Sequence, residues 1–264
     1  MKVLFAASEA HPFIKTGGLA DVVGSLPKCI DREYFDVRVI LPKYTCMKQE
    51  MKDKLSYVNH FYMDFHWKNE YVGIMYAEVD GVKYYFIDNE EYFGGDKPYG
   101  DIKSDIEKFV FFDKAVLSML PLIGFRPDLI HCHDWQTGLI PVFLKNEFQG
   151  DMFFWGIKTI MTIHNLKFQG VWDVKTMQGL TGFPKELFTP EEIAESDLRV
   201  ALIGELIKAR QEKGITQKQL EELSGVKQPV IARMEKGTSI PKVDTILKVL
   251  APLGKKLAVV AIDE

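Results

Sequence analysis

The chain has 264 residues, of which 47% are hydrophobic and 12% aromatic, so it can bury the core of one or two domains and is not a disordered polymer. Its net charge is −4. Because residues 191–264 hold twelve acidic and twelve basic side chains, the first 190 residues carry all of the excess negative charge. This excludes general nucleic-acid binding by the N-terminal part, whereas the balanced C-terminal part can still present a basic face.

The cysteines and the N-terminus indicate the compartment. Cys29, Cys46 and Cys132 are widely spaced and form no paired motif, which is typical of reduced thiols in the cytoplasm. The first twelve residues lack the apolar core of a signal peptide, and no run reaches the roughly 18 apolar residues of a membrane span. We therefore expect a soluble cytoplasmic protein without membrane contact.

Short apolar runs alternate with helical stretches through the first 165 residues. Strands are predicted at 3–6, 37–41, 71–79, 83–87, 129–132 and 159–163, and helices at 20–30, 102–120 and 137–145. Such alternation predicts a doubly wound α/β domain with a parallel sheet. Asp80-Gly81 between two of the runs predicts a hairpin, and thus an antiparallel addition to the sheet.

A run with two adjacent glycines follows the first predicted strand. It reads Lys-Thr-Gly-Gly-Leu-Ala-Asp-Val at 15–22 and leads into a predicted helix. Gly17 and Gly18 let backbone N–H groups approach an anion closely, and the positive end of the helix points to the same place. Lys15 adds a cation and Asp21 a hydrogen-bond acceptor. The run therefore predicts an anion site at the end of the first strand.

Two further polar clusters, at 131–138 and 162–170, follow the last two predicted strands. Ligands in open α/β sheets bind beyond the carboxyl ends of the strands. We therefore expect Asp134 of the first cluster, and His164 and Asn165 of the second, to share a crevice with the glycine run.

The histidines in these clusters allow other interpretations. His131 and His133 lie two residues apart on one face of a strand, so a metal site is conceivable, but no third ligand stands at a suitable spacing and we predict no metal. His164 by itself could be a hydrogen-bonded structural histidine. Its neighbour Asn165, together with the family resemblance of this motif given below, favours a sugar site instead.

Residues 1–190 resemble the N-terminal half of bacterial glycogen synthases and plant starch synthases. The resemblance rests on the lead-in at 7–12, the glycine run and the two later clusters. It implies a Rossmann-like half of a glycosyltransferase that faces the phosphates of ADP-glucose, with Asp134 in the acceptor region and His164 against the donor sugar. The nucleotide-sugar residues that it implies are Lys15, Gly17, Gly18, Asp21, His164 and Asn165.

The same resemblance predicts an incomplete catalytic site. Transfer with retention requires that the negative charge of the leaving diphosphate is neutralised. The resemblance implies that arginine and lysine of a second domain do this without a metal, so no cofactor is expected. In this chain, the sequence after residues 188–190 no longer resembles that family. Asp134 and His164 are then a half-site, which we expect not to transfer glucose.

Residues 189–253 carry the start and stop signals of four helices. Thr189 and Pro190 mark the first start, Gly214 its end, and Thr216 with Gln219 a capping box that opens the second helix. The third and fourth helices are predicted at 228–236 and 243–253. The side chains expected to face inward are Leu198, Leu202, Leu206, Ile207, Leu220, Leu223, Ile231, Met234, Ile246, Leu247 and Leu250.

The turn around Gly225 between two short helices predicts a helix-turn-helix. The pattern at 214–237 resembles the Xre and lambda-repressor-like family, including its antitoxin-type repressors, within a resemblance over 197–254. In that family the third segment lies in the major groove of double-stranded DNA. The resemblance implies base contacts by Lys227, Gln228, Pro229 and Arg233, and phosphate contacts by Gln217, Lys236 and Lys242. The alternative is a helical bundle used for packing or for protein contact.

The tail at 256–262 is apolar without alternation, as in a strand buried on both faces. A lone strand needs a partner. In antitoxin-like members a C-terminal strand pairs across a dimer, which predicts a homodimer through this segment and leaves a toxin as a possible further partner.

Together these patterns predict two domains. Residues 1–190 form a doubly wound, Rossmann-like glycosyltransferase half, and residues 191–264 a small all-α helix-turn-helix domain with a C-terminal strand. The expected function is sequence-specific DNA binding and repression. The alternatives are glucose transfer from ADP-glucose to an α-1,4-glucan, and an artificial fusion indicated by the abrupt join after Pro190.

Overall fold

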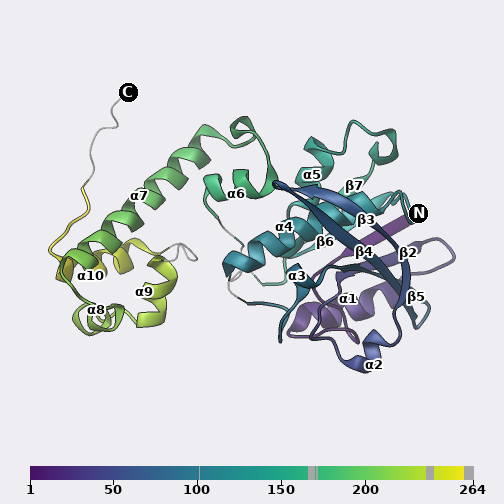
Figure 1. Cartoon of the computed structure of the whole chain (residues 1–264), viewed down its shortest axis with the longest axis horizontal. Helices are drawn as coiled ribbons and strands as arrows, with labels where there is room; N and C mark the ends of the chain where they lie inside the picture. The colour runs from purple at the N-terminus through teal and green to yellow at the C-terminus, as the bar shows by residue number, and fades with distance from the viewer. Residues whose placement is uncertain (101, 166–169, 171, 236–240, 259–264) are drawn as a thin grey trace. The chain divides into compact units, whose positions relative to one another are not determined.

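The structure is a computed structural model of the whole chain (Figure 1). It describes all residues except 101, 166–169, 171, 236–240 and 259–264, and for 102–103, 190–197 and 199 it describes the backbone alone. The chain divides into two compact units, Met1–Gly170 and Val171–Glu264. Each unit is described by itself.

The N-terminal unit is built on a seven-stranded sheet with the order β3-β4-β5-β2-β1-β6-β7. Strands β2, β1, β6 and β7 are parallel to their neighbours and β5 is parallel to β2, whereas β3, β4 and β5 form an antiparallel meander. The bounds of the strands are β1 Lys2–Ala6, β2 Asp36–Pro42, β3 Ser56–Phe65, β4 Lys68–Val79, β5 Val82–Asp88, β6 Leu129–His133 and β7 Lys158–Thr162.

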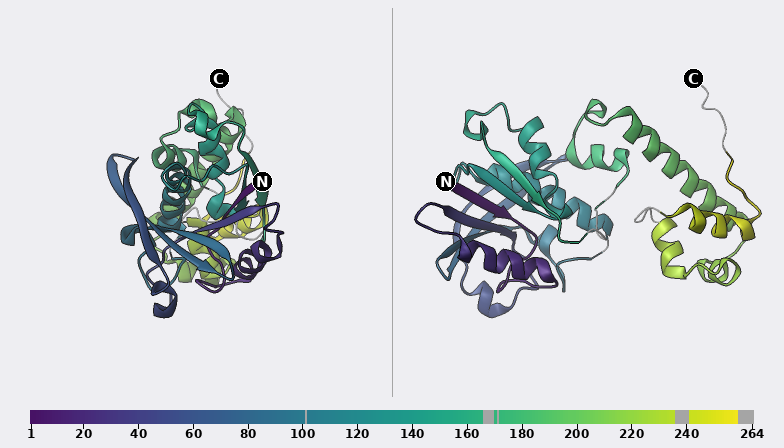
Figure 2. Two further views of the ribbon diagram at one scale, coloured as in Figure 1. Left: turned by 90° about the vertical axis from the view of Figure 1, so that its right-hand side faces the viewer. Right: turned by 180° about the vertical axis from the view of Figure 1, so that it is seen from behind.

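Helices cover both faces of this sheet (Figure 2). The sheet order places the crossover helix α1 on one face and α4 and α5 on the other, because right-handed crossovers that run in opposite directions along the sheet put their helices on opposite sides. The bounds of the helices are α1 Gly18–Cys29, α2 Gln49–Lys52, α3 Glu90–Phe93, α4 Ile102–Met119, η1 Trp135–Thr137, α5 Ile140–Asn146 and η2 Met152–Phe154. The predicted doubly wound fold is confirmed.

Local sequence explains the central elements. β1 is buried after its first residue because it lies between β2 and β6 under both helical layers. In α1, Gly24 lies so close to the preceding loop that an added Cβ would come within 2.5 Å of the His11 carbonyl oxygen. A glycine at this point therefore lets α1 lie against the segment that leads to the glycine run.

The hairpin at Asp80-Gly81 is confirmed, since β4 pairs antiparallel with β5 and both turn residues have positive φ, 52° and 73°. The sequence analysis missed β3. Five of its first six residues are exposed and its polar and aromatic residues do not alternate cleanly with apolar ones, because this edge strand carries a bulge between Tyr57 and Asn59.

The C-terminal unit is all helical among its described residues. Its elements are α6 Val174–Thr181, η3 Lys185–Leu187, α7 Pro190–Glu212, α8 Gln217–Ser224, α9 Gln228–Glu235 and α10 Val243–Leu253. The core is formed by apolar side chains of the last four helices and the turn after α8: Ile203, Leu206, Ala209, Leu220, Val226, Ile231, Met234, Ile246, Val249, Leu250 and Leu253. The four predicted helices, the capping box at Thr216 and the left-handed Gly225 are all present.

Three inward-facing predictions are wrong. Leu198, Leu223 and Leu247 are 72%, 60% and 46% exposed. Leu198 precedes the part of α7 that packs against this core, which begins at Leu202. Leu223 and Leu247 lie beside the buried stripes of α8 and α10 rather than within them.

The predicted C-terminal strand lies largely outside the described residues. Of its described part, Lys256, Leu257 and Ala258 are irregular, and Leu257 is 40% exposed. Within the described part of the chain, no helix is long and apolar enough to cross a membrane.

Candidate functional sites

The first candidate site follows from the strand order of the N-terminal unit. The chain leaves β1 toward β2 on one side and later adds β6 and β7 on the other, so the direction of winding reverses beside β1. In such sheets a crevice opens at the carboxyl ends of the strands where the direction reverses. The loops after β1, β6 and β7 stand at this edge, as the sequence predicted.

The glycine run forms the N-terminus of α1. Gly17 precedes the helix with an extended backbone, and an added Cβ at Gly17 or Gly18 would meet no atom within 4 Å. Lys15 and Asp21 form an ion pair with 2.7 Å between Nζ and Oδ1, and both side chains are about half exposed. Free backbone N–H groups, an open approach and a nearby cation are the features of an anion site at a helix N-terminus.

A buried carboxylate holds this loop, and the sequence analysis missed it. Glu9 is 3% exposed, and it accepts hydrogen bonds from the backbone N–H and the hydroxyl of Thr16 and from the hydroxyl of Tyr99. Tyr99 also bonds Ser8 at 2.8 Å. Its position could have indicated this role, because a glutamate soon after a buried strand tends to be buried and then needs hydrogen-bond partners.

Tyr99 holds the β1 side of the crevice through Ser8 and Glu9. Burial raises the pKa of its phenol well above the usual value, and the charges of Glu9 and Asp134 raise this pKa further, so the phenol stays protonated and donates to Glu9. Its loop is held by the buried pair Asp105 and Lys108: Asp105 accepts from the Gly100 N–H, and Lys108 donates to the Pro98 carbonyl. The crevice is therefore preorganised by contacts far apart in sequence.

Asp134 links the loop after β6 to the loop after β7. Its φ of 59° is rare for a residue other than glycine and marks local strain of the kind found at functional sites. Its Oδ1 accepts the backbone N–H of His164 at 2.6 Å, and its own N–H donates to the Thr162 carbonyl at 2.9 Å. The structure thus brings Asp134 and His164 together, and Asn165 follows in the same loop.

Three histidines lie beside this link. The rings of His131 and His133 are 4.2 Å apart, as expected from their shared strand face, and Nδ1 of His133 lies 2.9 Å from Nε2 of His164. Burial first, and then the neighbouring His131 and His164, lower the pKa of His133 to about 3; burial and His164 also lower that of His131. His133 is therefore neutral at pH 7. Among the described residues, no three His, Cys, Asp or Glu side chains are placed to hold a metal ion.

The second candidate site is the turn between α8 and α9. A buried ion pair underlies it: Arg210 donates to both carboxylate oxygens of Glu235, at 2.6 and 2.9 Å, and to the Ile215 carbonyl at 2.9 Å. The side chains of Arg210 and Glu235 are only 15% and 7% exposed. The pair therefore fastens α9 to the end of α7 and the segment before α8.

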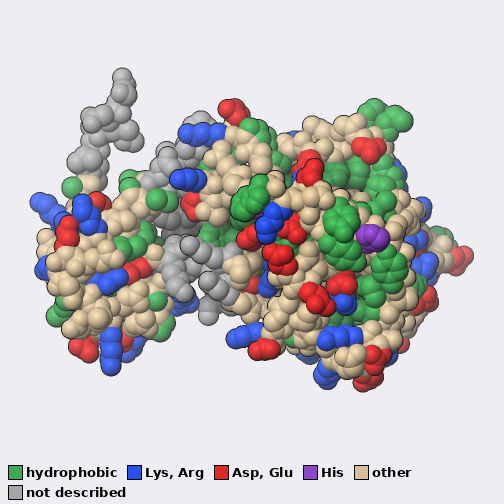
Figure 3. All heavy atoms as spheres, viewed as in Figure 1, with side chains coloured by type: hydrophobic (Ala, Val, Ile, Leu, Met, Phe, Trp, Pro, Cys, Tyr) green, Lys and Arg blue, Asp and Glu red, His purple; other side chains and the backbone are tan. Residues whose placement is uncertain are grey.

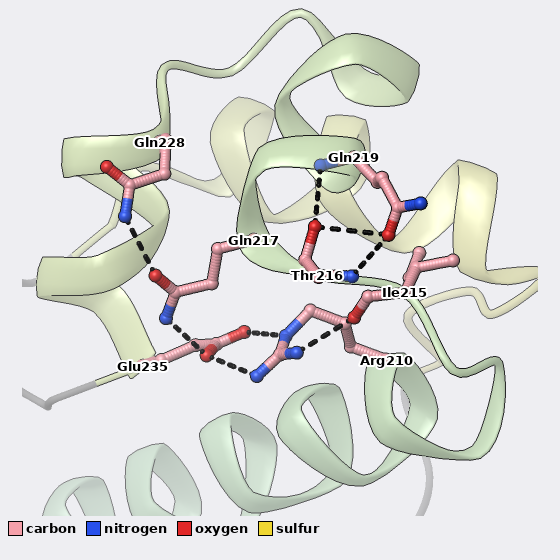
Figure 4. A network of polar contacts seen from close by, with 7 residues as sticks. All are labelled: Arg210, Ile215, Thr216, Gln217, Gln219, Gln228 and Glu235. Carbon is pink, nitrogen blue, oxygen red and sulfur yellow. Dashed lines mark hydrogen bonds and ion pairs between the residues drawn. The ribbon is translucent and has the colours of Figure 1, made fainter.

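Hydrogen bonds extend from the Arg210–Glu235 pair to Gln217 and Gln228, which are the first residues of α8 and α9 (Figure 4). Gln217 donates to Glu235 at 2.8 Å, and Gln228 donates to the Gln217 side-chain oxygen at 2.9 Å. The chain of contacts fixes both amides before any ligand arrives, which is how recognition residues are preorganised.

The other predicted DNA-binding residues are Lys227, Pro229, Arg233, Lys236 and Lys242. Lys227 is 80% exposed and lies 3.2 Å from Glu221, while Pro229 is the second residue of α9 and accepts from Arg233 at 3.2 Å. Lys242 precedes α10, and Lys236 lies outside the described residues. The structure thus gathers Gln217, Lys227, Gln228 and Pro229 around one turn.

The N-terminal unit is a doubly wound α/β fold with loops at its switch point, a type of fold that binds nucleotide sugars. The C-terminal unit contains a helix-turn-helix, a type of fold that binds DNA. Residues 2–211 match the model of the starch synthase catalytic domain, and residues 206–260 match a helix-turn-helix model. The chain therefore belongs to the starch synthase catalytic domain family and carries a helix-turn-helix domain at its C-terminal end.

Curated relatives agree with this membership. A glycogen synthase of Lachnospira eligens is 56% identical over 84% of this chain and 46% of its own length, and one of Lachnoclostridium phytofermentans is 60% identical over 73% and 40%. The chain thus spans less than half the length of these relatives.

Two solved structures were compared with this chain. The catalytic domain of starch synthase IV from Arabidopsis thaliana, bound to ADP and acarbose, matches with a TM-score of 0.61 and 31% identity over 72% of this chain and 38% of that chain. A toxin–antitoxin module from Streptococcus pneumoniae is 67% identical over 30% of this chain and 87% of that chain, with a TM-score of 0.27.

Proposed function

We propose that the chain is a sequence-specific binder of double-stranded DNA that acts as a repressor through its helix-turn-helix domain. The observation that carries the proposal is the chain of contacts from Arg210 through Glu235 and Gln217 to Gln228. It holds two amides at the N-termini of consecutive helices, where this motif meets a phosphate and a base edge.

The remaining residues have roles that their chemistry supports. Gln228 and Arg233 suit adenine and guanine, because a side-chain amide and a guanidinium can each form two hydrogen bonds to these bases. Lys227 and Pro229 contact base edges in the same groove. Gln217, Lys236 and Lys242 bind phosphates.

The proposed assembly is a homodimer through residues 256–262, since two-fold symmetry suits a palindromic operator. The proposed functional division is 1–190 and 191–264. A toxin partner is proposed only on the similarity of the pattern at 197–254 to antitoxin-type repressors.

Selection of bound duplexes from a random pool by the full chain should enrich a two-fold symmetric site, with strongly salt-dependent affinity. Gln228→Ala should bind the enriched site at least about tenfold more weakly, because it removes the amide that we assign to an adenine. Arg233→Ala should relax discrimination at one position. The measurement is fluorescence anisotropy over a salt series.

Lys208→Ala, an exposed cation on α7 paired only loosely with Glu205, serves as the control and should bind nearly as the parent does. Deletion of 256–264 should abolish the proposed dimer, so that the shortened chain selects only one half of the two-fold symmetric DNA site. A pool without enrichment, or a Gln228→Ala variant with unchanged affinity and specificity, contradicts the proposal.

A second candidate function belongs to the N-terminal unit, because the α1 N-terminus is open and carries Lys15 beside it. We propose that Lys15, Gly17, Gly18, Asp21, His164 and Asn165 bind the ADP-glucose of a glycogen-synthase-type reaction, with an α-1,4-glucan near Asp134. Because the chain spans less than half of its relatives, glucose transfer itself is the weaker part of this proposal.

Calorimetric titration of the full chain with ADP-glucose should detect binding, and Lys15→Ala should weaken it about tenfold through loss of one cation near the diphosphate. Lys158→Ala, a substitution at the exposed first residue of β7 and so at the amino ends of the parallel strands, is the control. An affinity that Lys15→Ala leaves unchanged would remove the anion site from the proposal. Synthesis of glucan from ADP-glucose by the isolated chain would make the enzyme the preferred function.

A further inference from the structure

A carboxylate lies among the residues that we assign to DNA. Glu221 belongs to α8, and both of its oxygens contact the start of α9. Its Oε2 accepts the backbone N–H of Gln228 at 3.0 Å, and its Oε1 lies 3.2 Å from Nζ of Lys227. Because DNA presents a dense row of negative phosphates, a negative side chain between two proposed base-contacting residues opposes binding unless it has a separate role.

The sequence before α9 explains one part of that role. Lys227 is the N-cap residue, since its carbonyl accepts the N–H groups of Val230 and Ile231 at 2.8 and 3.1 Å. Serine, threonine, asparagine or aspartate at an N-cap would offer a side-chain acceptor to the first N–H groups of the helix, whereas a lysine side chain has donors only. Glu221 supplies the missing acceptor from the neighbouring helix.

The carboxylate is the fixed partner in its ion pair, and the lysine is the mobile one. The side chain of Glu221 is 27% exposed and lines a shallow hollow together with Gln217 and Gln228, whereas that of Lys227 is 80% exposed. The Gln228 N–H, and then Lys227, lower the pKa of the Glu221 carboxyl, so it is charged at pH 7. An ion pair this exposed is weak, and it therefore biases the position of the lysine without locking it.

This bias decides which part of DNA the ammonium meets. Three N–H groups belong to a lysine ammonium, so Lys227 can keep one on Glu221 and still donate to a base acceptor beside Gln228. Without the carboxylate, its flexible stem lets the ammonium reach a phosphate, and phosphates attract it at every sequence alike.

The charge of the whole domain makes such a bias important. Residues 191–264 have no net charge, and Figure 3 shows acidic and basic side chains intermixed on one face of the C-terminal unit. Where so few cations are in excess, the placement of a single one changes the balance between phosphate contacts and base contacts.

We propose that Glu221 is a positioning residue that keeps Lys227 beside Gln228 at the base edges and away from the phosphates, and so sets the preference of the helix-turn-helix for its operator over other DNA. This role rests on the proposed function, in which the chain binds double-stranded DNA. It adds to the capping of α9, which by itself affects stability and not the choice of sequence.

The test is the variant Glu221→Gln in the full chain, because its amide oxygen still accepts the Gln228 N–H while the charge that holds Lys227 is lost. Fluorescence anisotropy over a salt series compares the enriched duplex with a scrambled duplex of the same length. The variant should bind the scrambled duplex about fivefold more tightly near 0.1 M salt, with a salt slope steeper by about 0.9, the value of one further phosphate contact. Its affinity for the enriched duplex should change by less than about twofold, so its specificity ratio falls.

Two further variants separate positioning from repulsion and from net charge. Lys227→Ala leaves the cap in place and should leave the salt slope on the scrambled duplex nearly unchanged, and adding Glu221→Gln to it should then have no further effect. Glu205→Gln removes the same charge from α7, where the carboxylate lies beside Lys208, and should retain the selectivity of the parent.

The possible failures are distinguishable. A parent chain that binds no duplex overturns the proposed function together with this role. A parent that binds the enriched duplex, with a Glu221→Gln variant of equal selectivity and salt slope, overturns the positioning role alone. An equal gain in affinity with and without Lys227 would show that the carboxylate repels DNA directly, which also overturns it. If Glu221→Gln does not fold, Lys227→Ala still decides, because a shallower salt slope on the scrambled duplex would place this lysine on phosphates in the parent.

Discussion

Replacing Glu235 by alanine should lower the free energy of unfolding of the helix-turn-helix unit by about 3 kcal/mol. The substitution leaves the Arg210 guanidinium largely buried without its carboxylate, and loss of one partner of a buried ion pair is far more costly than loss of an exposed one. Gln217 also loses the acceptor that holds its amide. Urea unfolding followed by circular dichroism measures the change.

A matched control is available on α7. Glu205 and Lys208 form an exposed pair 3.9 Å apart, and Glu205→Ala should change the free energy of unfolding by less than about 0.5 kcal/mol. Glu235→Gln, which keeps an acceptor for Arg210, should fall between the two. Equal effects of Glu235→Ala and Glu205→Ala would show that the buried pair does not fasten α9 to α7.

Acid should destabilise the N-terminal unit through His133. Burial and the two neighbouring histidines lower its pKa from 6.5 to about 3, so between these values the unfolded chain binds a proton that the folded chain does not. Stability from this histidine is complete above pH 6.5 and is lost as the pH falls toward 3, with a slope of up to about 1.4 kcal/mol per pH unit.

The variant His133→Phe isolates this contribution from that of the carboxylates. Between pH 6.5 and 5 the parent should lose about 2 kcal/mol more than the variant, since phenylalanine takes no proton beside Phe5 and His131. His11→Gln alters an exposed histidine and should leave the parent's pH dependence in place. Parallel pH profiles of parent and His133→Phe would contradict a buried neutral imidazole at this position.

Local sequence patterns predicted the elements whose residues follow a simple pattern, such as an apolar run or a typical turn pair. β1, β2, β6 and β7 are short apolar runs, and Asp80-Gly81 marks the hairpin by its turn chemistry alone. β3 was not predicted, because its bulge and its exposed aromatic residues hide the alternation of an edge strand. The burial of Leu223 and Leu247 was predicted wrongly, since both lie beside the buried stripes of their helices, and apolar spacing alone does not fix the edges of such a stripe.

For the crevice, sequence spacing placed Lys15, Gly17 and Gly18 after one strand and Asp134 and His164 after two others. Strand order then brings these loops to one edge of the sheet. Glu9, Tyr99 and the Asp105–Lys108 pair were not predicted as part of the site, because their roles depend on contacts that span up to 90 residues.

The sequence by itself determined the two kinds of domain, the ends of their helices and the residue types that face ligands, because caps, glycine turns and apolar periods act over a few residues. Only the tertiary structure decided which side chains meet. The buried Arg210–Glu235 pair and the strained Asp134 link to His164 each join residues from different parts of the chain. Such contacts are set by packing, which no local pattern encodes.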